Sequence, residues 1–192
     1  MRFLEVRRHG FTKKGDQRGR GSHLSQEGVS AAQAVGAELG PFAYVAVSES
    51  PRTMETAIAM GFAVDAVLPL GSRYASTGIA HHEQWAWDLP YVSYRERLAH
   101  GRSLAAAADE ELGLWLGVLA RIEHDQTALI VSHGGTIEPT LVAAYADADV
   151  ATWGRPFSHL DGIRLSFEGD RWVSLDWRRY TGMPRAPGPP AA

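Results

Sequence analysis

The tetrapeptide Arg7-Arg8-His9-Gly10 comes directly after the mostly apolar run Phe3-Leu4-Glu5-Val6. A second stretch of similar design, Val131-Ser132-His133-Gly134-Gly135, follows Ala128-Leu129-Ile130. Each run is typical of a buried strand, and glycine or a helix start comes after each histidine. Ligands of open α/β sheets bind just beyond the carboxyl ends of the strands. We therefore expect the two histidines to meet in one crevice, with an arginine beside the first.

The length and composition of the chain are those of an ordinary globular protein. It has 192 residues, of which 45% are hydrophobic and 21% charged, and this length is enough for one substantial core. Cysteine is absent, which excludes disulfides and thiolate metal sites. The first residues carry charges at Arg2, Glu5, Arg7 and Arg8, where a signal peptide would need an apolar stretch. No apolar run approaches the ~20 residues of a membrane span. We expect a cytoplasmic protein that does not enter a membrane.

The formal net charge of −3 argues against general affinity for nucleic acid. Basic residues nevertheless gather near His9, at Arg2, Arg7, Arg8, Lys13, Lys14, Arg18 and Arg20. This cluster is either a solvated basic loop or a positive rim that attracts an anionic ligand.

Strand and helix patterns alternate along the chain, which favours a mostly parallel sheet covered on both faces, a three-layer α/β/α fold. Ser25 is expected to cap a helix, and Pro51 to begin another in its first turn. The predicted strands are residues ~2–7, 44–47, 64–68, 127–131, 163–167 and 172–177. The predicted helices are residues ~26–39, 51–60, 104–124 and 136–145.

We expect a single domain over residues 1–180. Residues 69–103, rich in tryptophan, histidine and glycine, are predicted to form a partly helical excursion over the sheet edge, a variable lid that binds substrate. Residues 181–192 are rich in proline, glycine and alanine and are predicted to be a flexible tail. The tryptophans of the excursion would face either a pocket or a partner, so the sequence does not determine the oligomeric state.

Four motifs in order resemble those of the histidine phosphatase superfamily, the family of phosphoglycerate mutases and related acid phosphatases. They are Arg8-His9-Gly10, Leu24-Ser25-Gln26-Glu27-Gly28, Ser50-Pro51-Arg52-Thr53 and Ser132-His133-Gly134-Gly135. The match is close over residues ~1–60 and ~127–177 and thin between them. The resemblance, to the larger branch of the family, implies a phosphoglycerate mutase-like fold.

Phosphoryl transfer needs a nucleophile in line and positive charge around the equatorial oxygens. A neutral imidazole such as His9 is a good nucleophile near pH 7. The forked donors of Arg8 and Arg52 would grip phosphate oxygens, and protonated His133 would supply another donor. The amide of Gly134 would add one more. The resemblance implies the same roles for His9, Arg8, Arg52 and His133.

Two departures from the family pattern concern substrate contacts and the proton donor. After His9 the chain reads Gly10-Phe11-Thr12-Lys13-Lys14, so we expect Gly10, Thr12 and Lys14 to contact substrate. The family's general acid is a glutamate in a Leu-x-Glu stretch, whereas Leu68-Pro69-Leu70-Gly71 carries no acid. Glu83 is our candidate, with His81, His82 and Asp88 as alternatives; Glu138 is expected to be too far round its helix.

Phosphohistidine chemistry needs no metal or other cofactor, and we expect none. The spacing of His81-His82-Glu83 is not that of a helical zinc site. The expected function is metal-independent hydrolysis of phosphomonoesters through a phosphohistidine at His9, with a phosphorylated small molecule or a phosphoprotein as substrate. The alternatives are a phosphohistidine-protein phosphatase, a phosphoglycerate-type mutase and a catalytically weak domain that binds phosphorylated ligands.

Overall fold

The computed structural model describes residues 1–14, 22–71, 74–80 and 82–182. The predictions for Arg18, Arg20, His81 and most of the tail lie outside these residues. Within them the chain forms one six-stranded sheet with the order β3-β2-β4-β1-β5-β6. The strands are β1 (Arg2–Arg8), β2 (Tyr44–Ser48), β3 (Ala66–Leu68), β4 (Thr127–Ser132), β5 (Gly162–Glu168) and β6 (Arg171–Arg178).

The sheet is mostly parallel, as predicted. The first four strands run parallel to one another, and β5 and β6 join as an antiparallel hairpin beside β1. Strands β1, β2 and β4 lie inside the sheet and are buried along most of their length. Burial on both faces explains why their sequences read as continuous apolar runs instead of alternating patterns.

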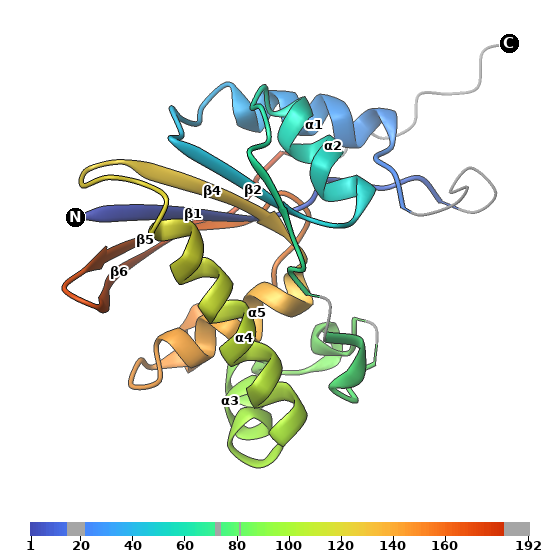
Figure 1. The fold of residues 1–192 in the computed structure, drawn as a ribbon. Helices are drawn as coiled ribbons and strands as arrows, with labels where there is room; N and C mark the ends of the chain where they lie inside the picture. Colours follow the sequence, from blue (N-terminus) through green and yellow to red (C-terminus); the bar gives the residue numbers. More distant parts are fainter. Residues whose placement is uncertain (15–21, 72–73, 81, 183–192) are drawn as a thin grey trace, which may run out of the picture.

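Helices cover both faces of the sheet and give the expected three layers (Figure 1). On one face lie α1 (Gln26–Gly36) and α2 (Pro51–Ala59). On the other lie α3 (Pro90–His100), α4 (Arg102–Leu119) and α5 (Gly134–Ala144). The described residues also form the short 3₁₀ helices η2 (Tyr74–Ser76), η3 (Glu83–Ala86) and η4 (Val150–Trp153). No helix in the described ranges is long and apolar enough to cross a bilayer.

The helix starts follow the local chemistry of the sequence. Ser25 caps α1, and its hydroxyl oxygen accepts a hydrogen bond from the Gly28 amide. Pro51 stands in the first turn of α2, where its missing N–H leaves no helical bond unmade. The excursion predicted over residues 69–103 ends in a regular helix, α3, which was not predicted from the sequence. This helix buries Tyr91 and Tyr94 in the core against α5.

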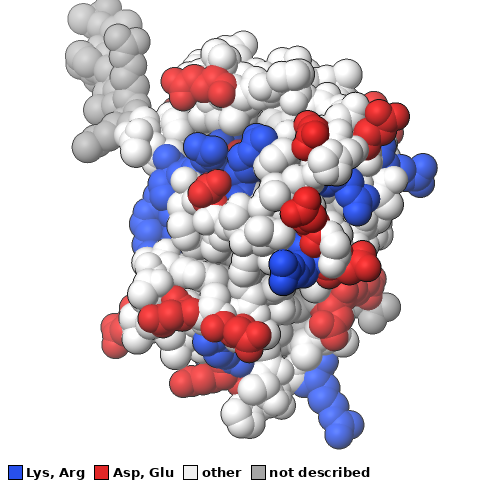
Figure 2. All heavy atoms as spheres, turned by 90° about the vertical axis from the view of Figure 1, so that its left-hand side faces the viewer, with Lys and Arg blue, Asp and Glu red and all other residues white. Residues whose placement is uncertain are grey.

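The largest part of the core lies between the sheet and α3–α5. Trp115 of α4, Tyr91, Tyr94 and Phe157 are almost completely buried there. On the other face of β1, Glu5 and Arg7 form a buried ion pair with a 2.8 Å contact. A charged groove beside α1 continues this face and is lined by Glu5, Glu38, Arg7, Arg164, Arg178 and Arg179. Figure 2 views the molecule from the left-hand side of Figure 1 and shows Lys and Arg side chains gathered in its upper part.

Gly28 lets α1 pack directly on the loop that follows His9. A Cβ at this position would lie 2.1 Å from the carbonyl oxygen of Phe11, far inside contact distance. The Gly28 carbonyl oxygen in turn lies 3.3 Å from the Cβ position of Gly10. The two glycines therefore allow the close approach that fixes the backbone next to the nucleophile candidate.

We predict that Gly28→Ala lowers the free energy of unfolding by ~2 kcal/mol or more, because backbone must move to admit the methyl group. The matched control is Gly113→Ala in α4, where a Cβ meets nothing within 4 Å. Gly113→Ala should raise stability by ~0.5–1 kcal/mol through helix propensity. Urea denaturation of both variants checks this, and equal effects of the two substitutions would contradict the packing argument.

Candidate active site

The pairing of β1 with β4 brings His9 and His133 together, as expected. The two strands are parallel with Arg8 opposite Ser132, so both histidines emerge at the same end of the sheet. The His9 amide donates to the Ser132 carbonyl oxygen at 3.0 Å, and the two imidazole centroids are 5.3 Å apart.

His9 is held in one tautomer by its own backbone. Its Nδ1 lies 2.8 Å from the Gly10 carbonyl oxygen, which can only accept, so Nδ1 carries the hydrogen. Nε2 is therefore left with its lone pair. Burial, with repulsion from His133 and Arg8, holds the pKa of the His9 imidazole well below its usual value. The ring is neutral near pH 7 and suited to nucleophilic attack.

His133 has the opposite tautomer. Arg52 Nη2 donates to His133 Nδ1 at 3.0 Å, so the hydrogen of the neutral ring is on Nε2, 2.9 Å from Ser48 Oγ. The Ser48 hydroxyl is also 2.9 Å from that of Thr53, which fixes it in turn. Burial, with the charges of Arg52 and Arg8, lowers the pKa of His133 to about 3. An anion among these groups would favour the protonated ring.

Arg8 and the N-terminus of α5 form the next part of the site. Arg8 is buried, and its Nη1 donates to the Phe157 carbonyl oxygen. Gly134, the first residue of α5, leaves room for it, since a Cβ there would lie 3.2 Å from Arg8 Cδ. Arg52 similarly stands in the first turn of α2. Two helix starts and two guanidinium groups therefore surround the imidazoles, an arrangement that favours a bound anion.

These residues line an open cleft of about 220 Å³. Five of the predicted site residues contribute to it: Arg8, His9, Arg52, His133 and Gly134. The remaining lining residues are Gly71, Tyr74, His82, Gln84, Gly135 and Thr136. The cleft therefore has a cationic part at the strand ends and an uncharged or weakly basic part formed by the excursion and α5.

Three other predicted substrate contacts do not line the cleft. The Gly10 amide donates to Thr56 Oγ1 at 3.0 Å and supports the loop from behind. Thr12 pairs with Leu24 in an isolated bridge. Lys14 is exposed, and its charge acts on His159. The structure thus gives these residues a place beside the site and not in its wall.

Glu83, the predicted proton donor, is not among the residues that line the cleft. One carboxylate oxygen accepts from Arg97 Nη2 at 2.8 Å, and the other from the Ala80 amide at 2.9 Å. Both oxygens are therefore engaged in holding η3 against α3. The neighbouring residues His82 and Gln84 line the cleft in its place. Glu138, expected to be too far round α5, is fully buried and accepts from Tyr94 Oη and the Phe157 amide.

His159 is a neighbour of the site that the motifs did not reveal. Its ring centroid is 5.4 Å from that of His9 and 4.8 Å from that of Phe11. Burial, followed by the charges of Arg8 and His82, lowers its pKa to about 3. Only the sheet topology could have revealed it. His159 comes shortly before β5, and because β5 runs antiparallel to β1, the start of β5 lies near the carboxyl end of β1.

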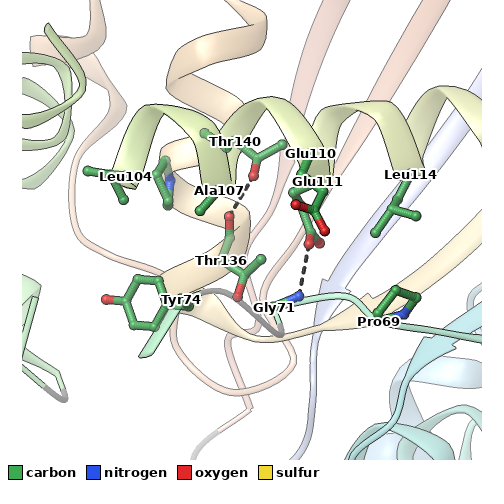
Figure 3. A pocket seen from close by; sticks show the side chains of 12 residues that line it. Pro69, Gly71, Tyr74, Leu104, Ala107, Glu110, Glu111, Leu114, Thr136 and Thr140 are labelled. Carbon is green, nitrogen blue, oxygen red and sulfur yellow. Dashed lines mark hydrogen bonds between the residues drawn. The ribbon is translucent and has the colours of Figure 1, made fainter. Parts of the chain in front are cut away.

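A small, mostly apolar pocket of about 20 Å³ adjoins the cleft and is lined by residues of α4 and α5 (Figure 3). Glu111 points from α4 to the Gly71 amide, which donates to it at 2.9 Å. Burial raises the pKa of this carboxyl group to about 7. Gly71 has φ +79°, and a Cβ there would lie 2.7 Å from Thr136 Oγ1. The Glu111 hydrogen bond and the close approach to Thr136 therefore place Gly71 against both α4 and α5.

Metal-binding groups are not gathered anywhere in the described ranges: no cluster of three or more histidine, aspartate or glutamate side chains suited to a metal ion occurs there.

The comparisons with known proteins agree with this geometry. The family model of the histidine phosphatase superfamily (branch 1) matches residues 6–179. The chain belongs to the histidine phosphatase superfamily, in its branch 1, and the family predicted from the four motifs is confirmed. The search of curated proteins found no match.

Solved structures show the same fold over nearly the whole chain. Phosphoserine phosphatase from Entamoeba histolytica, in complex with 3-phosphoglyceric acid, has a TM-score of 0.65 at 19% identity, covering 94% of this chain and 98% of that one. Mycobacterial glucosyl-3-phosphoglycerate phosphatase, in complex with VO3, has a TM-score of 0.65 at 24% identity, covering 94% and 100%. The fold is phosphoglycerate mutase-like, as predicted.

We predict that His9 and His133 are both neutral at about pH 6 but carry their hydrogens on different ring nitrogens. His9 should be the Nδ1–H tautomer and His133 the Nε2–H tautomer, because a carbonyl accepts from the first and a guanidinium donates to the second. Nitrogen-15 NMR of imidazole-labelled protein measures this, with His9→Ala and His133→Ala used for assignment. An Nε2–H tautomer of His9 would contradict the proposed availability of its nucleophilic nitrogen.

Proposed function

We propose that this protein is a metal-independent phosphomonoester hydrolase that forms a phosphohistidine at His9. The observation that carries the proposal is the neutral His9 ring, with Nδ1–H bound to its own backbone and Nε2 available, beside Arg8, Arg52 and His133. A phosphoryl group in this cleft meets a nucleophile and several donors at once.

In the first step His9 Nε2 attacks phosphorus, and the bond from phosphorus to the ester oxygen breaks. Arg8, Arg52 and the N-terminus of α5 stabilise the negative charge on the equatorial oxygens. His133 takes up a proton when the dianion binds and becomes a further donor. In the second step water attacks the phosphohistidine, which releases inorganic phosphate and restores the neutral imidazole.

The leaving alkoxide needs a proton, and His82 is the candidate donor that the geometry supports best. Among the alternatives to Glu83, it is the described residue that lines the cleft, to which it comes from the excursion. The carboxylate of Glu83 is held by Arg97 and the Ala80 amide, which leaves it a positioning role in η3.

Small phosphorylated molecules are the proposed substrate class. Two structural relatives are named as phosphatases of phosphoserine and of glucosyl-3-phosphoglycerate, and the superfamily itself is one of phosphatases. The phosphohistidine-protein phosphatase is the second candidate function. It is favoured by the described residues of the cleft lining, which offer imidazole, amide and hydroxyl groups but no carboxyl group as a proton donor. An imidazole leaves more readily than an alkoxide, so a phosphohistidine substrate needs such a donor less.

We predict that His9→Ala lowers the rate of p-nitrophenyl phosphate hydrolysis in EDTA by ~10³-fold or more, because the nucleophile is lost. His100→Ala, an exposed histidine at the end of α3, is the matched control and should keep wild-type turnover. Alkaline quenching with ³²P-labelled substrate should trap label on wild-type protein only. Full turnover by His9→Ala would refute the mechanism, and vanadate binding without any hydrolysis would favour the ligand-binding domain.

We further predict that His82→Gln lowers kcat by ~10²-fold for an alkyl phosphate and by much less for p-nitrophenyl phosphate, whose phenolate leaves without a proton. Glu83→Gln should show no such dependence on the leaving group. Steady-state rates with both substrates separate the two residues. A loss confined to alkyl phosphates in Glu83→Gln would return the role of proton donor to Glu83.

A further inference from the structure

Gln84 is a buried polar side chain in the wall of the cleft. It is only 2% exposed, and its carbonyl oxygen Oε1 is buried with no hydrogen-bond partner in the described part of the chain. A buried acceptor without a donor is unfavourable, and such groups in native proteins call for an explanation. At the wall of a substrate cleft, the explanation is a donor that arrives with the ligand.

The position of Gln84 is fixed by the surrounding side chains. The ion pair of Glu83 and Arg97 anchors η3 to α3 at 2.8 Å. The Arg97 guanidinium also lies over the Trp87 ring, 4.5 Å from its centroid, and that ring packs edge-on against Tyr94 at 5.0 Å. The turn between residues 82 and 87 is therefore held on a core helix. A side chain so held can discriminate between ligands, because it does not move away from a poor one.

The cleft divides by charge, and this assigns Gln84 to one part of the substrate. Arg8, Arg52 and the two imidazoles form the part that suits a phosphoryl group. Gln84 belongs, with Tyr74 and His82, to the lining residues that the excursion contributes, and the alcohol of a phosphomonoester held by the cationic residues would extend toward this lining. A carbonyl oxygen accepts hydrogen bonds, so the matching group on the alcohol is an N–H or O–H.

We propose that Gln84 selects phosphomonoesters whose alcohol carries an amino or hydroxyl group close to the ester oxygen, by accepting a hydrogen bond from that group. The inference rests on the proposed phosphatase function and adds the substrate class. A site built to hydrogen-bond a substrate group discriminates strongly against an analogue that lacks the group, since its own buried polar atom then stays unpaired.

The test compares three small phosphomonoesters of similar size. 2-Aminoethyl phosphate and 2-hydroxyethyl phosphate carry the donor, and propyl phosphate has a methyl group in its place. Wild-type kcat/KM should be at least about tenfold higher for the two donor-bearing esters than for propyl phosphate. The measured quantity is this ratio, which a general loss of stability or of phosphate affinity does not change.

Variants of Gln84 identify the residue responsible. Gln84→Met keeps the length of the side chain but offers no amide, so the ratio should fall to about one. Gln84→Glu retains an acceptor oxygen at the same place, and the ratio should persist even where phosphate affinity falls. Trp85→Phe, an exposed position on the same turn, is the matched control and should keep the wild-type ratio. Circular dichroism confirms that each variant is folded.

The outcomes separate this inference from the function on which it rests. A wild-type ratio near one, with all three esters hydrolysed and His9→Ala inactive, would overturn the role of Gln84 and leave the phosphatase intact. A ratio that survives Gln84→Met would overturn it as well. If no ester is hydrolysed and no phosphohistidine is trapped, the proposed function fails and the inference falls with it.

Discussion

The burial of two imidazoles next to fixed positive charge governs the protonation of this site. Burial disfavours the protonated form of His9 and of His133, and the positive charges of Arg8 and Arg52 beside them disfavour it further. The pKa of each imidazole lies below its usual value, and each ring keeps a lone pair. One lone pair is engaged by Arg52, and the other is available on His9. A phosphate dianion supplies the negative charge that this group of residues lacks.

Burial supports the same electrostatic arrangement from behind. The carboxylate of Asp161 is fully buried and accepts hydrogen bonds from Arg155 and Arg179, and its backbone carbonyl accepts from the Arg8 amide. The fully buried Glu138 acts on Arg8 by Coulombic attraction, and burial raises the pKa of its own carboxyl group to about 7. These carboxyl groups stabilise Arg8 without entering the cleft, so the face that meets substrate stays positive.

Much of the fold was predictable because local and global signals agree. The runs before His9 and His133 are apolar without alternation, as in strands buried on both faces, and both became inner strands. Ser25 and Pro51 mark helix starts through hydrogen-bonding chemistry that does not depend on tertiary contacts. The gathering of Arg8, His9, Arg52, His133 and Gly134 then follows from the parallel order of the strands. The single domain and the catalytic roles of these residues remain predictions.

The wall opposite the histidines was not predictable at the level of single residues. Successive residues of a 3₁₀ helix point about 120° apart, so Glu83 and Gln84 face different surroundings although they are neighbours in sequence. Glu83 forms an ion pair with Arg97 of α3, a contact that no local pattern encodes, and Gln84 lines the cleft. His159 comes from a loop distant in sequence, and only the sheet order places it near His9.

The central place of β1 has a consequence for how the protein is made. Its two partners in the sheet are β4 and β5, residues 127–132 and 162–168, so the strand that carries His9 makes only distant pairings. During synthesis β1 has no partner strand until β4 has been made, more than a hundred residues later. The cleft that His9 and His133 share is therefore assembled only after β4 has been synthesised.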